Sequence, residues 1–306
     1  MKQLLTRFAS LSLLVVLAVS CAKQNDVIPA TAPADSNGPA TSALQSVTAA
    51  TATATRDNNL ALGNPSGAVA STSYPTNYLL TKSQYTLSYN RDQGKANWVS
   101  WHLSSAWQGS TARQDNFSPD ATLPSGWYQV RTSDYTGSGF DRGHNCPSAD
   151  RTGSVADNSA TFLMTNMMPQ ASVNNQQTWT GLENYCRTLT AAGNELYIIC
   201  GSYGKGGTGV NGYATTIAAG KVTVPANCWK VVVVLPNGSS DISRITTSTR
   251  VIAINTPNTT SIGTSWGAYR TSVDAIEAAT GLDLLSALST TLQGTLEAKT
   301  DAGATN

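Results

Sequence analysis

The stretch Gly137-Ser138-Gly139-Phe140-Asp141-Arg142-Gly143-His144 lies near the middle of the chain and opens the segment that decides the fold. In that segment, residues 140–187, polar side chains of catalytic type gather: His144, Asn166, Asn175, Glu183, Arg142 and Arg187. An imidazole can accept a proton near neutral pH, and amide and carboxylate oxygens are suitable ligands for hard divalent cations. The segment therefore predicts a site that combines proton transfer with a bound cation.

Residues 174–190 predict an amphipathic helix. At about 100° per residue, its apolar side chains fall in one stripe: Trp179, Leu182, Cys186 and Leu189. Asn175 lies one turn before Trp179 on the same stripe, where a carboxamide is either a helix cap or a ligand. Glu183 and Arg187 are four residues apart, and this spacing alone predicts an ordinary surface ion pair worth under about 1 kcal/mol.

Segments of alternating or β-branched residues on both sides of this helix predict strands. The expected strands are 85–89, 97–103, 195–200, 221–224, 228–235 and 250–255, and a short helix is expected at 272–279. Strands interrupted by one or two functional helices indicate an α+β domain. His102 lies inside the second strand, and we interpret it as structural. The proton-transfer role then falls to His144, because the chain has only two histidines.

The N-terminus has the layout of an export signal. Residues 1–20 carry Lys2 and Arg7, then an apolar run too short to span a bilayer comfortably, then a small residue before Cys21. The order Leu17-Ala18-Val19-Ser20-Cys21 resembles the lipobox of bacterial lipoproteins, in which the cysteine is acylated. We expect an exported chain with a lipid anchor at Cys21, in the cell envelope at the outer membrane or cell surface; simple secretion with a free Cys21 is the alternative.

Composition then sets the expected domain boundaries. Residues 21–68 are rich in Ala, Thr, Ser, Pro and Asn and predict a flexible tether, because so few apolar side chains cannot offset the entropy of ordering. We expect one folded domain at 69–293 and a disordered tail at 294–306.

The other four cysteines form an even number in an exported chain, which favours disulfides. Cys200 and Cys228 lie at the ends of two strands that could be neighbours, so we expect them to pair. Cys146 would then pair with Cys186. A cysteine-ligated zinc ion is the rival, but no Cys-x-x-Cys spacing occurs.

The low net charge argues against long-range capture of polyanions. Only 12% of the residues are charged and the formal net charge is +1, which becomes −1 without Lys2 and Arg7. A nearly neutral chain lacks the strong field by which very basic proteins capture polyanions over long distances. Any attraction for phosphate must therefore be local.

Several motifs, in order along the chain, resemble the DNA/RNA non-specific endonucleases, the ββα-metal or His-Me finger nucleases. The resemblance spans residues 85–285 and rests on Arg113 with Phe117, Asp141-Arg142-Gly143-His144, Asn166 through Gln170, the helix carrying Asn175, Glu183 and Arg187, and Glu277 with Thr280-Gly281-Leu282-Asp283. It implies a central, mostly antiparallel sheet flanked by helices.

The resemblance also implies a role for each site residue. His144 would be the general base, Asn175 the direct ligand of a Mg²⁺ ion (with Mn²⁺ a possible substitute), and Glu183 a ligand acting through water. Arg113, Arg142 and Arg187 would contact the phosphate, with Arg187 also catalytic, while Asn166 would position His144 or the substrate. Asp141 would brace the hairpin.

The implied activity is Mg²⁺-dependent hydrolysis of DNA and RNA with little sequence specificity, leaving 5′-phosphates. Two alternatives stay open at this stage. One is an inactive lipoprotein of the same fold that binds polyanions; the other is a related phosphodiesterase acting on small nucleotides.

Overall fold

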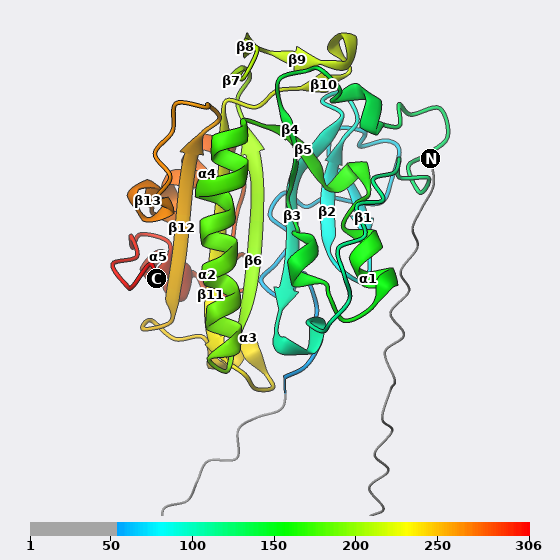
Figure 1. Ribbon diagram of the computed structural model, residues 1–306. Coiled ribbons are helices and arrows are strands. Elements are labelled where there is room, and N and C mark those ends of the chain that lie inside the picture. Colours follow the sequence, from blue (N-terminus) through cyan, green and yellow to red (C-terminus); the bar gives the residue numbers. More distant parts are fainter. Residues whose placement is uncertain (1–53) are drawn as a thin grey trace, which may run out of the picture. The chain divides into compact units, whose positions relative to one another are not determined.

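A seven-stranded antiparallel sheet runs through residues 54–306, the part of the chain that the computed structural model describes (Figure 1). In spatial order its strands are β1 (Tyr78–Thr81), β2 (Thr86–Asn90), β3 (Lys95–Leu103), β6 (Asn194–Tyr203), β11 (Asn227–Pro236), β12 (Arg250–Pro257) and β13 (Arg270–Thr271). The expected α+β class is confirmed, and five of the six strands expected from the sequence lie in this sheet. The segment expected at 221–224 forms only the short β10 (Val222–Thr223), paired with β9 (Thr216–Ile217) outside the main sheet.

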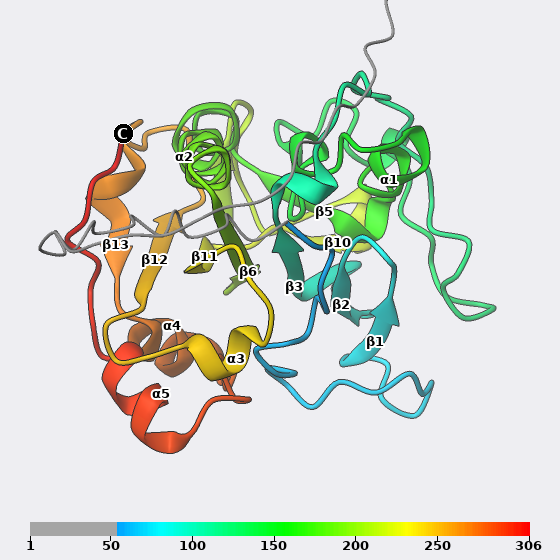
Figure 2. The ribbon, with the colours of Figure 1, turned by 90° about the horizontal axis from the view of Figure 1, so that it is seen from below.

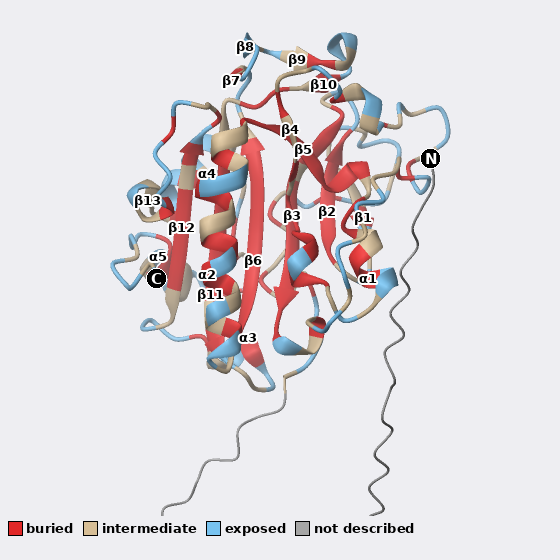
Figure 3. Ribbon diagram, in the orientation of Figure 1, coloured by how far each residue is buried: buried red, intermediate tan, exposed pale blue. Residues whose placement is uncertain are grey.

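Helices cover both faces of the sheet, which explains why its central strands are apolar on both sides. α2 (Thr180–Ala191) packs on one face; α3 (Asp241–Arg244), α4 (Val273–Thr280) and α5 (Thr290–Leu296) lie on the other (Figure 2). Figure 3 shows the strands buried almost along their whole length. The run Val231–Val233 in β11 illustrates this: its side chains alternate between two separate cores.

A second, smaller layer carries the polar segment. β4 (Asp141–His144) pairs with β5 (Met167–Gln170) as a two-stranded ribbon, and α1 (Val155–Ala160) lies in the connection between them. A π-helical turn, Asn174–Trp179, follows β5 and leads directly into α2. A further hairpin, β7 (Gly207–Gly209) and β8 (Gly212–Ala214), lies above the β4–β5 ribbon in the view of Figure 1. None of the helices between residues 54 and 306 has the length and apolar character needed to cross a bilayer.

Both expected domain boundaries need correction. The signal segment, Cys21 and the tether up to residue 53 lie outside the described residues, but residues 54–68 belong to the folded part: Leu62 and Ala68 are buried in its core. At the other end Leu296 is buried, and Asp301 Oδ2 forms an ion pair with Arg250 Nη2 at 2.8 Å. Composition did not predict these contacts, because a few buried apolar side chains and one ion pair are enough to fix a mostly polar segment to the folded domain.

The predicted disulfides are absent: Cys146, Cys186, Cys200 and Cys228 are all buried free thiols. Cys200 lies opposite Lys230 in the β6–β11 register, whereas Cys228 lies opposite Ser202. The two cysteines are therefore diagonal neighbours, and diagonal positions are further apart than a disulfide allows. Burial raises the pKa of Cys146, Cys186 and Cys228 to about 12, which makes these thiols unreactive.

Candidate active site

The β4–β5 ribbon places His144 opposite Met167. Gly143, next to it, is required by close packing: a Cβ atom there would lie 2.3 Å from Oε1 and 2.7 Å from Cβ of Gln170. The glycine lets the two strands approach with the Gln170 side chain between them. The backbone carbonyl of His144 accepts from the indole Nε1 of Trp179 at 3.3 Å, so the ribbon is also joined to the helical segment.

The imidazole of His144 lies against two phenylalanine rings. The ring centroid of Phe162 is 5.1 Å away and edge-on, and that of Phe117 is 5.6 Å away. Burial, together with the guanidinium groups of Arg113 and Arg142, lowers the pKa of His144 to about 3. The imidazole is therefore neutral at physiological pH, which corrects the expectation that it titrates near neutrality. Its Nε2 atom is buried and has no hydrogen-bond partner among residues 54–306.

Asn175 faces the same cavity as His144 because the helix is widened at its start. In the π-helical turn the backbone bonds span five residues, as between the carbonyl of Asn175 and the N–H of Thr180. A wider turn rotates Asn175 away from the apolar stripe, while Trp179 stays in the core. The position expected from 100° per residue was therefore wrong, and the side chain is not a helix cap. Its Nδ2 donates to Asp141 Oδ2 at 2.9 Å.

Two adjoining cavities meet at this point. One, of about 260 Å³, is lined by His144, Asn175, Glu183 and Arg187 among others. The second, of about 320 Å³, continues along Phe117, Tyr135 and Phe140. Arg113, Arg142 and Asn175 line both. All the predicted site residues except Asn166 thus converge on one polar groove.

Arginines flank the groove and are held in place. Arg113 donates to Ser148 Oγ at 2.8 Å and pairs with Asp115 at 2.7 Å. The guanidinium carbon of Arg142 lies 4.2 Å from the ring centroid of Phe117. Arg187 pairs with the buried Asp150 at 2.8 Å. Anchored guanidinium groups around a cavity suit the oxygens of a phosphate.

Glu183 does not form the expected ion pair with Arg187. Its Oε1 accepts from Nζ of Lys230, a buried lysine of β11, at 3.3 Å. Burial raises the pKa of Glu183 despite the opposing Lys230 charge. Burial alone would lower the pKa of Lys230, but Glu183 and neighbouring acidic groups raise it. Glu183 is thus a cavity-lining carboxylate whose charge depends on a buried partner.

Asn166 lies behind the site rather than in it. It is fully buried; its Nδ2 donates to the carbonyls of Cys146 and Thr161 at 2.8 Å each, and its Oδ1 accepts from the Cys146 N–H at 3.0 Å. These bonds fix the backbone just after His144. Of the two roles considered, positioning of His144 fits this geometry and contact with the substrate does not.

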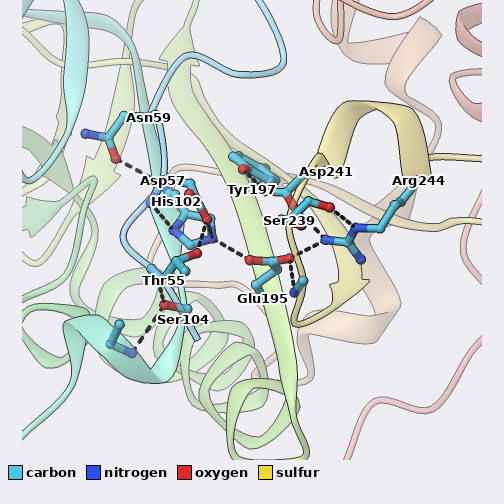
Figure 4. A network of polar contacts seen from close by, with 12 residues as sticks. Thr55, Asp57, Asn59, His102, Ser104, Glu195, Tyr197, Ser239, Asp241 and Arg244 are labelled. Atoms are coloured by element: carbon cyan, nitrogen blue, oxygen red, sulfur yellow. Dashed lines mark hydrogen bonds and ion pairs between the residues drawn. The ribbon is translucent and has the colours of Figure 1, made fainter. Parts of the chain in front are cut away.

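His102 does not line the groove; it is fully buried in β3 as a structural residue, as expected, within a separate polar network (Figure 4). Its Nδ1 accepts from the backbone N–H of Asp57 at 3.2 Å, which leaves the ring proton on Nε2, 3.2 Å from Glu195 Oε2. Arg244 and Asp241 continue this network. Because Nε2 donates, the cluster does not offer an imidazole ligand to a metal.

Three residues of the site were missed by the sequence argument. Phe162 packs on His144, Lys230 neutralises Glu183, and Asp150 holds Arg187. Asp150 lies within the polar segment 140–187 and could have been considered there. For Lys230 the only signal in the sequence is that a lysine occurs in an otherwise apolar strand.

The residues around the groove fit a hard divalent cation. The Asp141 carboxylate can accept only from the amide NH₂ group of Asn175, so the amide oxygen is left for the cavity. One neutral oxygen ligand and a nearby carboxylate at Glu183 match the preference of Mg²⁺ for few protein oxygens and several waters.

Comparisons with known proteins agree with this geometry. Residues 63–291 match the family model described as DNA/RNA non-specific endonuclease. A nuclease of Nostoc sp. is 53% identical over 243 residues, which cover 79% of this chain and 86% of that protein. The mitochondrial nuclease EXOG of Danio rerio is 32% identical, with 52% of this chain and 48% of that protein covered. A chain from the crystal structure of the EndoG/EndoGI complex shares the fold, with a TM-score of 0.60 at 22% identity, over 75% of this chain and 91% of that chain.

Proposed function

The chain belongs to the DNA/RNA non-specific endonuclease family, and on that basis we propose that it hydrolyses phosphodiester bonds of DNA and RNA with Mg²⁺, leaving 5′-phosphates. One observation carries the proposal: His144, from the ribbon, and Asn175, from the following helix, line one cavity that anchored arginines surround. A base, a cation ligand and phosphate-binding groups are then within one site.

His144 acts as the general base. Its imidazole is neutral and accepts a proton from the attacking water. Arg113, Arg142 and Arg187 hold the phosphate and stabilise the charge that builds up on its oxygens. Asn175 and Glu183 would hold Mg²⁺, which when bound polarises the phosphoryl group and stabilises the leaving oxygen. Such contacts to the sugar–phosphate backbone read no base sequence, and low specificity follows.

Removal of the cation tests this proposal. Cleavage of plasmid DNA and of RNA should require a divalent ion and stop with EDTA. Asn175→Ala should raise the Mg²⁺ concentration for half-maximal cleavage by at least about tenfold, because a ligand is lost. Gln177→Ala, exposed on the same turn, is the matched control and should leave that concentration unchanged.

Cleavage that persists in EDTA would contradict the metal-dependent mechanism. A saturable shift of labelled DNA without any cleavage in Mg²⁺ or Mn²⁺ would instead identify a binding protein. Hydrolysis of a nitrophenyl phosphodiester without cleavage of plasmid would identify a small-nucleotide phosphodiesterase.

We further propose that Cys21 is acylated and anchors the exported enzyme to the cell envelope, on the strength of the residues before it. Cells fed an alkyne fatty acid should label the wild-type chain in the membrane fraction. Cys21→Ser should lose the label and leave that fraction. An unlabelled wild-type chain, or a labelled variant, would show that the anchor is not at Cys21.

A further inference from the structure

Three carboxylates converge on the face of the sheet opposite the groove. Asp274 and Glu277 lie on α4, and Glu297 directly follows α5, which packs beside α4 (Figure 2). One oxygen from each lies within 4.8 Å of the other two. The backbone N–H of Asp274 also donates to the carbonyl of Glu297 at 3.1 Å, so the two helices are already joined there.

Glu297 is the unusual member of this group. Only 5% of the residue's surface is exposed, and its buried Oε1 atom has no hydrogen-bond partner in residues 54–306. A buried carboxylate oxygen without a partner costs free energy unless something neutralises it. Burial, with the nearby charges of Glu277, Asp274 and Asp283, raises the pKa of Glu297 to about 7.

The other carboxylates have ordinary structural roles. Asp274 lies in the first turn of α4, where a negative charge is favourable, and Glu277 Oε1 accepts from the N–H of Leu284 at 2.6 Å. No lysine, arginine or histidine of the described chain forms an ion pair with Asp274, Glu277, Asp283 or Glu297. The cluster therefore has an excess of negative charge, and one buried carboxylate oxygen of Glu297 has no hydrogen-bond partner among the described residues.

We propose that Asp274, Glu277 and Glu297 bind a Ca²⁺ ion that joins α4 to the C-terminal segment. The donor set is oxygen only, which excludes soft metals and favours Ca²⁺ or Mg²⁺. Ca²⁺ accepts irregular geometry and bonds of 2.3–2.6 Å, which suits one shorter and two longer carboxylate side chains, whereas Mg²⁺ demands near-ideal octahedral coordination. Asp274 is exposed, so water can complete the coordination from that side. This site is separate from the groove and does not depend on the proposed function.

Thermal unfolding tests the site without interference from the groove. The full chain carrying Asn175→Ala, freed of metal with EGTA, is the parent, measured at pH 8 with 10 mM CaCl₂ or with NaCl of equal ionic strength. Binding to the folded state alone should raise Tm by roughly 5 °C in Ca²⁺. Adding Glu297→Gln, which keeps the shape but removes the charge, should abolish the shift, and adding Asp274→Asn should reduce it.

Asp92→Asn, which removes an exposed carboxylate elsewhere, is the control and should keep the full shift. A parent whose Tm ignores Ca²⁺ would overturn the proposal. So would a Glu297→Gln chain that shows the parent's shift. Glu297→Gln without Ca²⁺ should also unfold at a higher temperature than the parent at pH 8, because it removes charge repulsion; this confirms that the variant is folded.

Discussion

Replacing His144 with alanine is expected to lower kcat/KM for plasmid DNA by about 10²–10⁴-fold, the usual contribution of a positioned general base. The anchored arginines and the cation ligand Asn175 stay in place, so binding of DNA should persist. Tm should change by little, because the Nε2 atom of His144 has no hydrogen bond among the described residues. Steady-state cleavage with and without the substitution, at saturating Mg²⁺, measures the effect.

The second histidine is the natural control. His102→Gln removes a fully buried ring that forms a hydrogen bond with Glu195, so it should lower Tm while the folded fraction keeps its kcat.

The pH dependence of kcat/KM gives an independent check on His144. Because the pKa of His144 is lowered to about 3, its basic form persists at acidic pH, and the ratio of wild-type to His144→Ala kcat/KM should stay constant from pH 5 to 8. A ratio that falls tenfold per pH unit below 6.5 would contradict the lowered pKa of His144.

Local chemistry made much of the fold and site predictable. The sheet strands follow their apolar patterns, and α4 appears where its pattern and Gly281 place it. The site residues, by contrast, were identified from the order of motifs that resembles the endonuclease family, and Gly143 is needed because a Cβ atom there would clash with Gln170 of the paired strand. The apolar patterns and helix ends that depend on neighbours in sequence were recovered from the residues themselves.

Features that depend on distant neighbours were not. Asn175 faces the groove because of a π-helical turn, which a fixed 100° period cannot express. Glu183 pairs with Lys230 of β11 rather than with Arg187 on its own helix, and the strand register decides that Cys200 and Cys228 are only diagonal neighbours. Spacing along the chain contains no information on which residue of a strand 47 positions later will contact a helix.

The strongest effect on stability is expected from Lys230→Met. Lys230 Nζ lies 3.3 Å from Glu183 Oε1 and 4.1 Å from the ring centroid of Trp179, in a buried position. Removing it leaves Glu183 buried without its partner, and loss of one member of such a pair costs about 3–5 kcal/mol. Urea unfolding of the wild type and the variant measures this difference in the free energy of unfolding.

The double variant Lys230→Met/Glu183→Gln separates the charge from the packing. With both charges removed, no uncompensated carboxylate is left, so most of the lost stability should return, while cleavage stays low if Glu183 helps to hold the cation.

The stability of the single variant Lys230→Met should also depend on pH. The pKa of Glu183 is already raised by burial, and without Lys230 it rises further, so the folded state holds a proton that the unfolded chain releases. Its stability is then retained at pH 4 and lost as the pH rises toward 8. Equal losses at both pH values, or additive effects in the double variant, would show that Lys230 acts through packing alone.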